Sequence, residues 1–329
     1  AYLEVGKVFE RAGDLKKAIQ AYSNVAKKMK DRPELRIEAI SRSMRFMHES
    51  DDAKYKEGHA AWLALDSDKK KKKKMPKKKG KNRKSVSKMI KQVQAIWDSE
   101  KSARKGMAVY YYAQAMFYGA EYAYDDFANL TLTDVKNMKG LKPMLEKQAK
   151  LLKGAEAAYF KVIDTTAAGL GRAFAAAAAF KIGLLYYRFK EDLFNAPLPR
   201  QIEKLSDMGY TDVEDRYRET IEKIAAPIEE QALVALRHAI NVAHNLGVYN
   251  KWSKEAGVYA AKVNPAEYPT VEKDPNLPQA TTALNPNKTT DPATSASFIT
   301  RVRRGKFTVS FKPKNITTKD KKAAKRAEH

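Results

Sequence analysis

The sequence predicts an all-α protein, built as a solenoid of stacked antiparallel helix pairs. Three observations lead to this fold class. Apolar residues recur every three or four positions over most of residues 1–264, which is the period of a helix face. Glycine and proline fall mainly between these stretches, where they end one helix and begin the next. The alternation that is typical of strands is confined to residues 298–311, where it is a weak signal for a short β-hairpin.

The first 34 residues predict one helix pair, with Gly13-Asp14 as the turn between the helices. Its small residues are Gly6, Ala18 and Ala26, and its larger apolar residues are Tyr2, Val5, Phe9, Leu15 and Tyr22. This pattern resembles the tetratricopeptide repeat, in which a glycine allows close approach of the second helix and aromatic residues fill the wedge. The resemblance implies that Gly6, Phe9, Ala18 and Tyr22 have structural roles. It also implies a unit that stacks on neighbours and offers a concave surface to a partner protein.

Two further helices and a basic segment follow the first pair. Pro33 is suited to the first turn of a new helix, and Ser50-Asp51-Asp52 predicts a turn within residues 34–65. Residues 1–66 are therefore expected to hold two helix pairs. Residues 67–84 predict a solvated linker or loop, because lysines repel one another there and Pro76 and Gly80 interrupt the run. Ser85 then begins a helix that should extend to about Lys105.

Residues 107–127 predict a helix with eight aromatic residues. Helical spacing places Tyr111, Tyr118 and Tyr122 in one stripe. The stripe could be a groove for an extended peptide or a partner helix, with Tyr187 and Arg188 as further candidates. It could equally pack between stacked helices, which is the more common use of such residues in repeat proteins.

The rest of the helical region extends to residue 264. Residues 141–164 and 172–193 predict two helices, and the second repeats the opening pattern, with Gly183 and Tyr186 corresponding to Gly6 and Phe9. An irregular segment, 195–212, should precede a long helix at 213–246 and a last helix that stops at Asn264-Pro265.

Domain boundaries follow from these elements. Residues 85–264 are predicted as a helical-repeat domain. Residues 265–329 are predicted as an extended tail, first rich in proline and then basic.

The net charge of +24 lies almost wholly in two segments. Residues 69–84 contain 12 basic and no acidic residues, and residues 300–329 carry a net charge of +9, which leaves +3 for the other 283 residues. The run could bind nucleic acid, an anionic membrane or a cell-wall polymer, or act as a nuclear localisation signal, although charge runs are most often solvated surface. The candidate residues for binding an anionic surface are Lys69, Lys70, Lys71, Lys72, Lys73, Lys74, Lys77, Lys78, Lys79, Lys81, Arg83 and Lys84.

No pattern in the sequence indicates an enzyme, a metal site or a cofactor. There is no cysteine, so thiolate nucleophiles and thiolate ligands are excluded. His238 and His244 are six residues apart on one predicted helix and so face different sides. The stretch Gly169-Leu170-Gly171 follows a helix and lacks the lysine and hydroxyl of a phosphate-binding loop, so we interpret it as a turn. We therefore predict no catalytic residues, no metal and no cofactor.

No segment is expected to span a membrane. The most apolar run, 173–187, is shorter than the roughly 20 residues that a spanning helix needs. No signal peptide is visible, and the sequence begins inside a predicted helix. We therefore expect a fragment or a processed form.

The C-terminal half is similar to a narrower group of proteins. The residues that carry the similarity are FKEDLFNAPLP, then Ala226-Pro227 and Glu229 to Ala232, and then LGVYNKWSKEAGVYAAKVNPAEYP. They resemble bacterial envelope tetratricopeptide proteins associated with Ton/Tol-type energy-transduction motors and with myxobacterial adventurous gliding motility. The resemblance covers roughly residues 173–269 and the repeat at 1–34.

This resemblance implies a periplasmic, non-enzymatic scaffold that links a proton-driven motor to other envelope proteins. The rival interpretation is a cytoplasmic or nuclear helical-repeat protein that binds RNA or DNA through its lysine-rich segments.

Overall fold

The computed structural model describes residues 2–65, 76, 78, 80–101, 104–132, 138–166, 170–210, 212–246 and 251–268. Among these residues every regular element is a helix and none is a strand, which confirms the predicted all-α class. The lysine run 69–74, Lys77, Lys79 and the predicted tail beyond residue 268 lie outside the described residues. So does the hairpin signal at 298–311.

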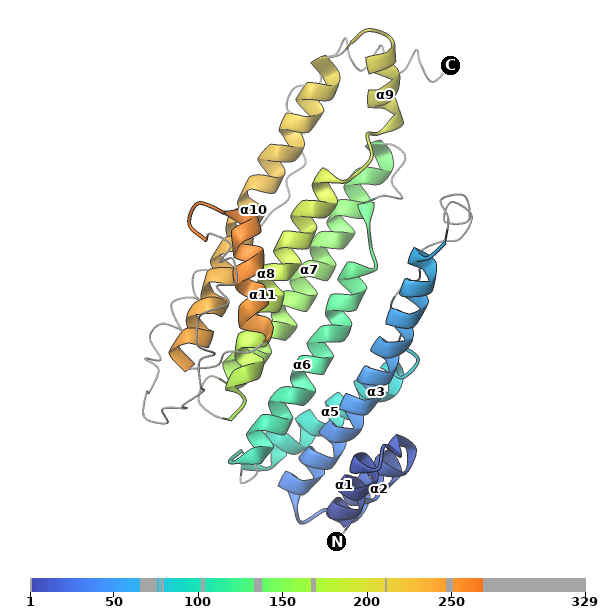
Figure 1. The fold of residues 1–329 in the computed structure, drawn as a ribbon, viewed down its shortest axis with the longest axis vertical. Helices are drawn as coiled ribbons and strands as arrows, with labels where there is room; N and C mark the ends of the chain where they lie inside the picture. The colour runs from blue at the N-terminus through green and yellow to red at the C-terminus, as the bar shows by residue number, and fades with distance from the viewer. Residues whose placement is uncertain are drawn as a thin grey trace, which may run out of the picture. The chain divides into compact units, whose positions relative to one another are not determined.

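The chain divides into two compact units, each built from more than one segment. One unit contains Ala1–Asn129 and Ala155–Ala178, and the other contains Leu130–Gly154 and Ala179–His329. Two helices, α7 (Met138–Thr166) and α8 (Arg172–Phe194), contribute residues to both units (Figure 1).

The first unit begins with five helices packed in sequence order. They are α1 (Tyr2–Arg11), α2 (Leu15–Lys28), α3 (Pro33–Leu63), α5 (Arg83–Ser99) and α6 (Met107–Ala128). Helix α1 packs on α2, α2 packs on α3, and α3 packs on both α5 and α6 (Figure 1). The α1–α2 and α2–α3 connections are short, so consecutive helices lie side by side there.

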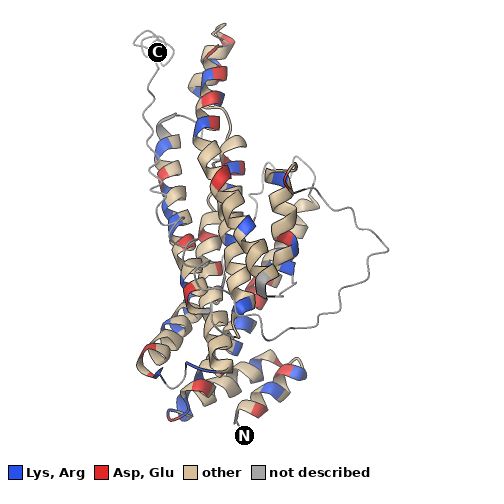
Figure 2. Ribbon diagram, turned by 90° about the vertical axis from the view of Figure 1, so that its left-hand side faces the viewer, with Lys and Arg blue, Asp and Glu red and all other residues tan. Residues whose placement is uncertain are grey.

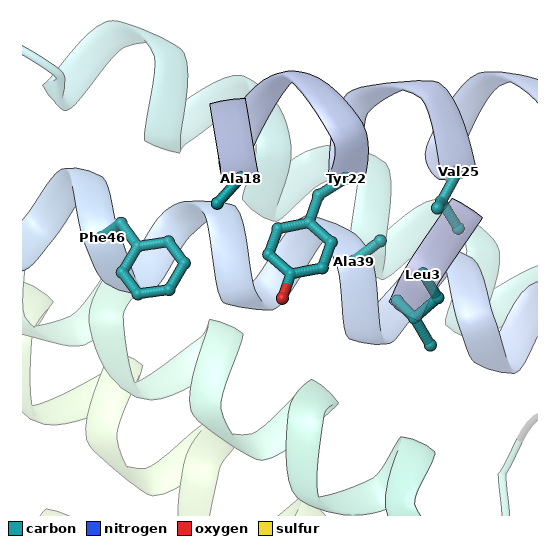
Figure 3. Close-up of a cluster of buried hydrophobic side chains, with 6 residues drawn as sticks. All are labelled: Leu3, Ala18, Tyr22, Val25, Ala39 and Phe46. Carbon is teal, nitrogen blue, oxygen red and sulfur yellow. The ribbon is translucent and has the colours of Figure 1, made fainter. Parts of the chain in front are cut away.

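The α1–α2 turn is formed by Gly13 and Asp14, as the sequence predicts. Gly13 has a φ of 76°, a left-handed conformation that suits glycine. The Asp14 side chain then accepts a hydrogen bond from the backbone N–H of Lys17 and caps α2. The two helices and α3 enclose a core whose buried members are Leu3, Ala18, Tyr22, Val25, Ala39 and Phe46 (Figure 3).

The predicted turn at Ser50-Asp51-Asp52 is wrong, because α3 continues through it to Leu63 as one 31-residue helix. Residues 34–57 contain neither glycine nor proline to end the helix. The two aspartates act on other partners instead of capping a new helix. Asp51 is buried and accepts hydrogen bonds from Asn82, and Asp52 pairs with Lys56 one turn later.

The second unit is centred on the C-terminal half of α8 and on α10 (Asp212–Leu246). Helices α9 (Arg200–Asp207) and α11 (Lys251–Val263) both pack on α10. The segment 195–212, predicted to be irregular, therefore contains one short helix. Along α10, ion pairs join residues one turn apart, such as Arg216 with Asp212 and Arg218 with Glu214. Figure 2 shows how basic and acidic residues are distributed over the helices.

No helix among the described residues is both long enough and apolar enough to cross a bilayer. This agrees with the expectation from the hydropathy of residues 173–187.

Candidate protein-interaction site

The outward surface of α1 is apolar and exposed. Tyr2 is 44%, Val5 46% and Val8 57% exposed, whereas Leu3 and Gly6 on the opposite side of the helix are buried. Ala12 continues the same stripe, since its backbone N–H donates to the carbonyl of Val8 and so completes one more helical turn. Tyr2, in contrast, contacts α2, where the Lys28 ammonium lies 4.9 Å from its ring centroid. We call the surface formed by Val5, Val8 and Ala12 the α1 outer face.

The α1 outer face exists because α1 carries apolar residues on two sides. Successive helical positions are separated by about 100°, so Val5, Val8 and Ala12 fall within a narrow sector. Leu3 and Gly6 fall in the opposite sector, where they contact the core. A helix that is apolar on both sides is normally covered on both sides. Among the described residues, other helices cover only the side of α1 that carries Leu3 and Gly6.

The larger apolar residues of the repeat pattern are not all buried. Tyr2 and Val5 are exposed, and Leu15 is 39% exposed. Only Tyr22 is fully buried among the five larger residues, while Phe9 is partly buried against the core. The sequence does contain a signal for this arrangement, because a helical projection of residues 2–12 alone separates the two sides of α1.

Gly6 and Ala18, the small residues of the pair, lie where helix approach requires them. A Cβ placed on Gly6 would be 2.4 Å from Cε1 of Tyr22, far inside van der Waals contact. Ala18 is completely buried beside the same ring. Gly183 has a similar place in the second unit, because a Cβ there would be 2.7 Å from Cγ of Leu236.

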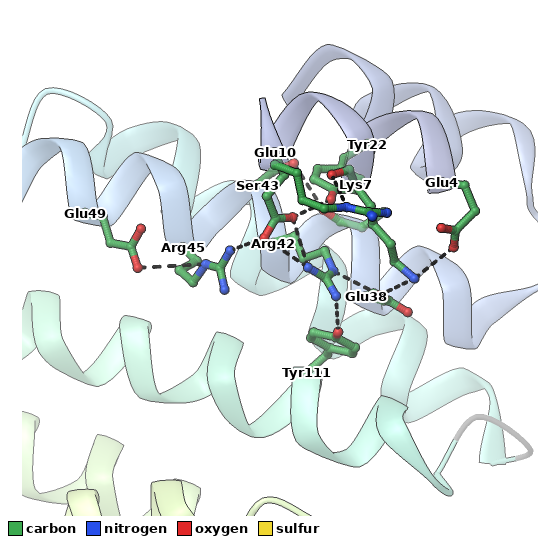
Figure 4. A network of polar contacts seen from close by, with 12 residues as sticks. Glu4, Lys7, Glu10, Tyr22, Glu38, Arg42, Ser43, Arg45, Glu49 and Tyr111 are labelled. Carbon is green, nitrogen blue, oxygen red and sulfur yellow. Dashed lines mark hydrogen bonds and ion pairs between the residues drawn. The ribbon is translucent and has the colours of Figure 1, made fainter. Parts of the chain in front are cut away.

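A network of charged and phenolic side chains fixes α1 on α3 (Figure 4). Its centre is the Glu10 carboxylate, which accepts hydrogen bonds from the Tyr22 hydroxyl at 2.6 Å, from Arg42 at 2.9 Å and from Arg45 at 2.6 Å. Burial alone would raise the pKa of Glu10, but these donors and charges outweigh it and lower that pKa. Burial and the Glu10 hydrogen bond together raise the pKa of Tyr22.

The predicted aromatic stripe on α6 packs inside the first unit. Tyr111 and Tyr122 are buried and Tyr118 is half-buried. Arg42 donates to the Tyr111 hydroxyl at 2.6 Å, and the Tyr118 ring lies against His48 with centroids 4.9 Å apart. Burial raises the pKa of Tyr111 to about 12. These contacts favour the packing interpretation of the stripe over a peptide groove.

Tyr187 and Arg188 lie on α8 in the second unit. The Tyr187 ring is half-buried and makes an edge contact with Tyr259 of α11, with centroids 5.0 Å apart. Arg188 is exposed, and Tyr186 is buried. Tyr187 therefore helps to hold α11 on α8.

Lys78, one of the lysines assigned to an anionic surface, forms ion pairs within the first unit. Its ammonium lies 2.9 Å from Asp52 and 3.2 Å from Asp125, and its backbone N–H donates to the Asn129 side chain at 2.8 Å. Burial would lower the pKa of Lys78, but the charges of Asp125 and Asp52 outweigh it and raise that pKa. Burial likewise opposes ionisation of Asp52, yet hydrogen bonds from Lys56 and Lys78 lower its pKa to about 2.

Arg83 also forms an ion pair and hydrogen bonds within the first unit. Its guanidinium binds both oxygens of Asp126 and donates to the carbonyl of Tyr122. Just before it, the backbone N–H of Asn82 donates to Asp51 at 3.0 Å. A Cβ on Gly80 would be 2.5 Å from an oxygen of that carboxylate.

Lys78 and Arg83 therefore have protein carboxylates as partners. Lys81 and Lys84 are exposed. The other candidate lysines lie outside the described residues, so their binding to an anionic surface stays a prediction. No local pattern in the sequence indicates the pairing of Lys78 and Arg83, because their aspartate partners are 26 to 47 positions away.

Among the described residues, no group of three or more His, Asp or Glu side chains is arranged to hold a metal ion.

Comparison with known proteins found no matching family model, no similar curated protein and no similar solved structure. The exposed apolar residues of the α1 outer face remain the candidate for a contact with another protein.

Proposed function

We propose that this chain is a non-enzymatic protein–protein interaction scaffold of the bacterial cell envelope, and that it serves a proton-driven motor or a gliding machine. The observation that carries the scaffold role is the α1 outer face, where Val5 and Val8 are about half exposed on a helix that is apolar on both sides. Exposed apolar surface of this kind marks sites of protein contact.

The architecture of the first unit supports this role. Helices α1, α2 and α3 pack in succession, as do the helices of a tetratricopeptide solenoid. The close approach of Gly6 to the buried Tyr22 ring is the contact that the repeat pattern requires. In a solenoid each unit packs its apolar face against a neighbour, so the exposed apolar residues of α1 suit a contact with another protein segment.

Two of the twelve candidate basic residues, Lys78 and Arg83, favour a structural role over nucleic-acid binding. Lys78 and Arg83 are matched by Asp52, Asp125 and Asp126, so their charges are already compensated. Nucleic-acid binding depends on cations that neutralise phosphates.

The envelope location and the link to a Ton/Tol-type or gliding motor rest on the resemblance that residues 173–269 carry. A periplasmic location is part of the same proposal.

The test compares envelope proteins that co-purify with the tagged chain after mild crosslinking in the bacterium that encodes it. The variant Val5→Asp/Val8→Asp places two charges on the α1 outer face. Val258→Asp, on α11, is the matched control because Val258 is 51% exposed and also on a helix. Both variants should retain the wild-type circular dichroism spectrum, since the altered side chains face solvent.

We expect motor components to dominate the wild-type and Val258→Asp samples, and to fall at least tenfold with the double variant. Equal recovery from all three forms would contradict a docking role for α1. A sample dominated by RNA-associated proteins would contradict the scaffold proposal as a whole.

A further inference from the structure

We propose that the end of helix α3, residues 53–63, lies in the surface of an anionic phospholipid membrane. We call this segment the α3 tip. It is a different surface from the α1 outer face, and its role does not depend on the proposed function. Three features carry the proposal: the exposure of the segment, its aromatic stripe, and the lysines on both sides of that stripe.

The α3 tip is the exposed part of a helix that is otherwise buried. The last buried residue of α3 is Asp51, whereas the helix itself continues to Leu63. Up to Asp51 the helix is held by α6, since the His48 ring lies against Tyr118 and the Tyr122 hydroxyl donates to Asp51 at 3.3 Å. Helical segments of a few turns gain most of their stability from packing of an amphipathic face. A further surface that covered the α3 tip would therefore stabilise it.

Aromatic side chains form a stripe along one side of the α3 tip. Tyr55, His59 and Trp62 follow one another at intervals of four and three residues, so they share one face of the helix. Ring centroids are 5.6 Å apart for Tyr55 and His59, and 6.3 Å apart for His59 and Trp62. All three side chains are partly exposed, and Leu63 beside them is 53% exposed. Amphipathic rings next to an aliphatic side chain are typical of protein surfaces at the boundary between lipid and water.

Lysines flank the stripe on both sides. At about 100° per residue, Lys54 and Lys56 lie on either side of Tyr55, and Glu57 lies nearly opposite. Both lysines are exposed, and the Lys56 ammonium is 2.7 Å from Asp52, one turn earlier. Lysines in these positions can extend their ammonium groups to lipid phosphates while the stripe enters the bilayer.

The charge of the surrounding sequence favours an anionic surface. Residues 54–84 contain 14 basic and three acidic residues, a net charge of +11. Lys78 and Arg83 are paired with internal aspartates, and without them the charge is still +9. Positive charge of this density attracts anionic lipids over about one Debye length. The contact itself is assigned to the α3 tip.

A membrane explains the stripe better than a nucleic acid does, although both would attract the lysines. Stacking of bases needs accessible ring faces, whereas the His59 ring lies between those of Tyr55 and Trp62. Exposed Leu63 contributes nothing to the binding of a phosphate or a base, but it gains from transfer into acyl chains. The binding is therefore peripheral, with the helix in the plane of the membrane surface.

The first experiment is co-sedimentation of the purified full chain with vesicles, at low and high salt. One set of vesicles contains phosphatidylcholine alone, and the other contains phosphatidylcholine and phosphatidylglycerol. Leu63→Asp removes the aliphatic contact, and Lys54→Glu reverses one flanking charge. Val258→Asp and Lys254→Glu are the matched controls, because both residues are exposed on α11.

We expect binding only to the vesicles with phosphatidylglycerol, and weaker binding at high salt. Leu63→Asp should weaken binding about tenfold, since it replaces an inserted leucine by a charge. Lys54→Glu should weaken it about fivefold. The two α11 controls should bind as the wild type does.

A second measurement separates insertion from electrostatic attraction. Because the chain has no cysteine, Leu63→Cys and Val258→Cys can each carry a single dye whose emission rises in apolar surroundings. We expect anionic vesicles to raise the emission at Leu63→Cys and to leave that at Val258→Cys unchanged.

The inference is overturned if the wild type does not bind anionic vesicles, or if Leu63→Asp binds them equally well. Salt-sensitive binding to single-stranded RNA without any binding to vesicles would assign the lysines to a nucleic acid and reject the membrane. Neither result bears on the α1 outer face, which is tested by Val5→Asp/Val8→Asp. Equally, loss of the docking role of α1 would leave membrane binding by the α3 tip intact.

Discussion

Replacing Gly6 with alanine should destabilise the first unit, although the same change in a helix usually stabilises it. The new Cβ would lie 2.4 Å from Cε1 and 2.6 Å from Cδ1 of Tyr22. That ring is completely buried, and its hydroxyl donates to Glu10 at 2.6 Å. The ring cannot move aside without losing this hydrogen bond to a charged acceptor.

The magnitude follows from three opposing contributions. Alanine is favoured over glycine within a helix by about 1 kcal/mol. Overpacking a filled core costs about 1–3 kcal/mol, and a weakened hydrogen bond to a carboxylate costs about 1 kcal/mol more. The expected net loss in the free energy of unfolding is therefore about 2 kcal/mol.

Urea denaturation followed by circular dichroism at 222 nm would measure this loss. Gly58→Ala is the matched control, because Gly58 is also inside a helix but has no atom within 4 Å of its added Cβ. It should stabilise by about 1 kcal/mol. A Tyr22→Leu background should remove most of the cost of Gly6→Ala. The steric explanation is refuted if Gly6→Ala and Gly58→Ala both stabilise the protein equally.

Three further outcomes follow from other contacts. Gly183→Ala should cost about 1–2 kcal/mol in the same denaturation assay, because its Cβ would also lie 3.1 Å from the backbone nitrogen of Leu236; an unchanged midpoint would contradict that close approach. Lys78→Met should destabilise by about 3 kcal/mol at pH 7, since it removes the cation that lies beside the buried Asp125 carboxylate, and a neutral effect would argue against the ion pair. Asp52 has a pKa lowered from 3.8 to about 2, so its stabilising effect is complete above about pH 4 and is lost as the pH falls toward 2. Asp52→Asn should therefore cost about 1–2 kcal/mol at pH 7, after allowance for solvent screening, and almost nothing at pH 2; a cost that does not depend on pH would contradict this.

Helix periodicity was enough to predict most of the fold where local signals agreed. The long helix predicted at 213–246 is found at Asp212–Leu246, because acidic residues begin it and the apolar period continues to its end. The helix predicted at 172–193 is found at Arg172–Phe194 for similar reasons.

Prediction failed where a residue acts through a partner distant in the sequence. Asp51 and Asp52 have the composition of a turn, but they bind Asn82 and Lys78 from within a continuous helix. A charge pattern alone could not show that Lys78 and Arg83 are paired with carboxylates of α3 and α6. The sequence could not decide the role of the aromatic stripe on α6 either, because helix packing and a peptide-binding groove both use aromatic residues.

The candidate site was within reach of the sequence but was not found. The repeat pattern groups Val5 with the larger apolar residues of the pair, and the structure shows that Val5 and Val8 are exposed whereas Leu3 and Gly6 are buried. A repeat motif describes one unit in the middle of a stack. It does not say which of its faces a given chain leaves uncovered.

The most direct test of the central claim is a photoreactive amino acid placed at Val8 in the bacterium that encodes the chain. We predict a light-dependent adduct at Val8 that contains an envelope protein, and none at the control position Val258. An equal yield at both positions, or no adduct at Val8, would contradict the claim that the α1 outer face is a docking surface.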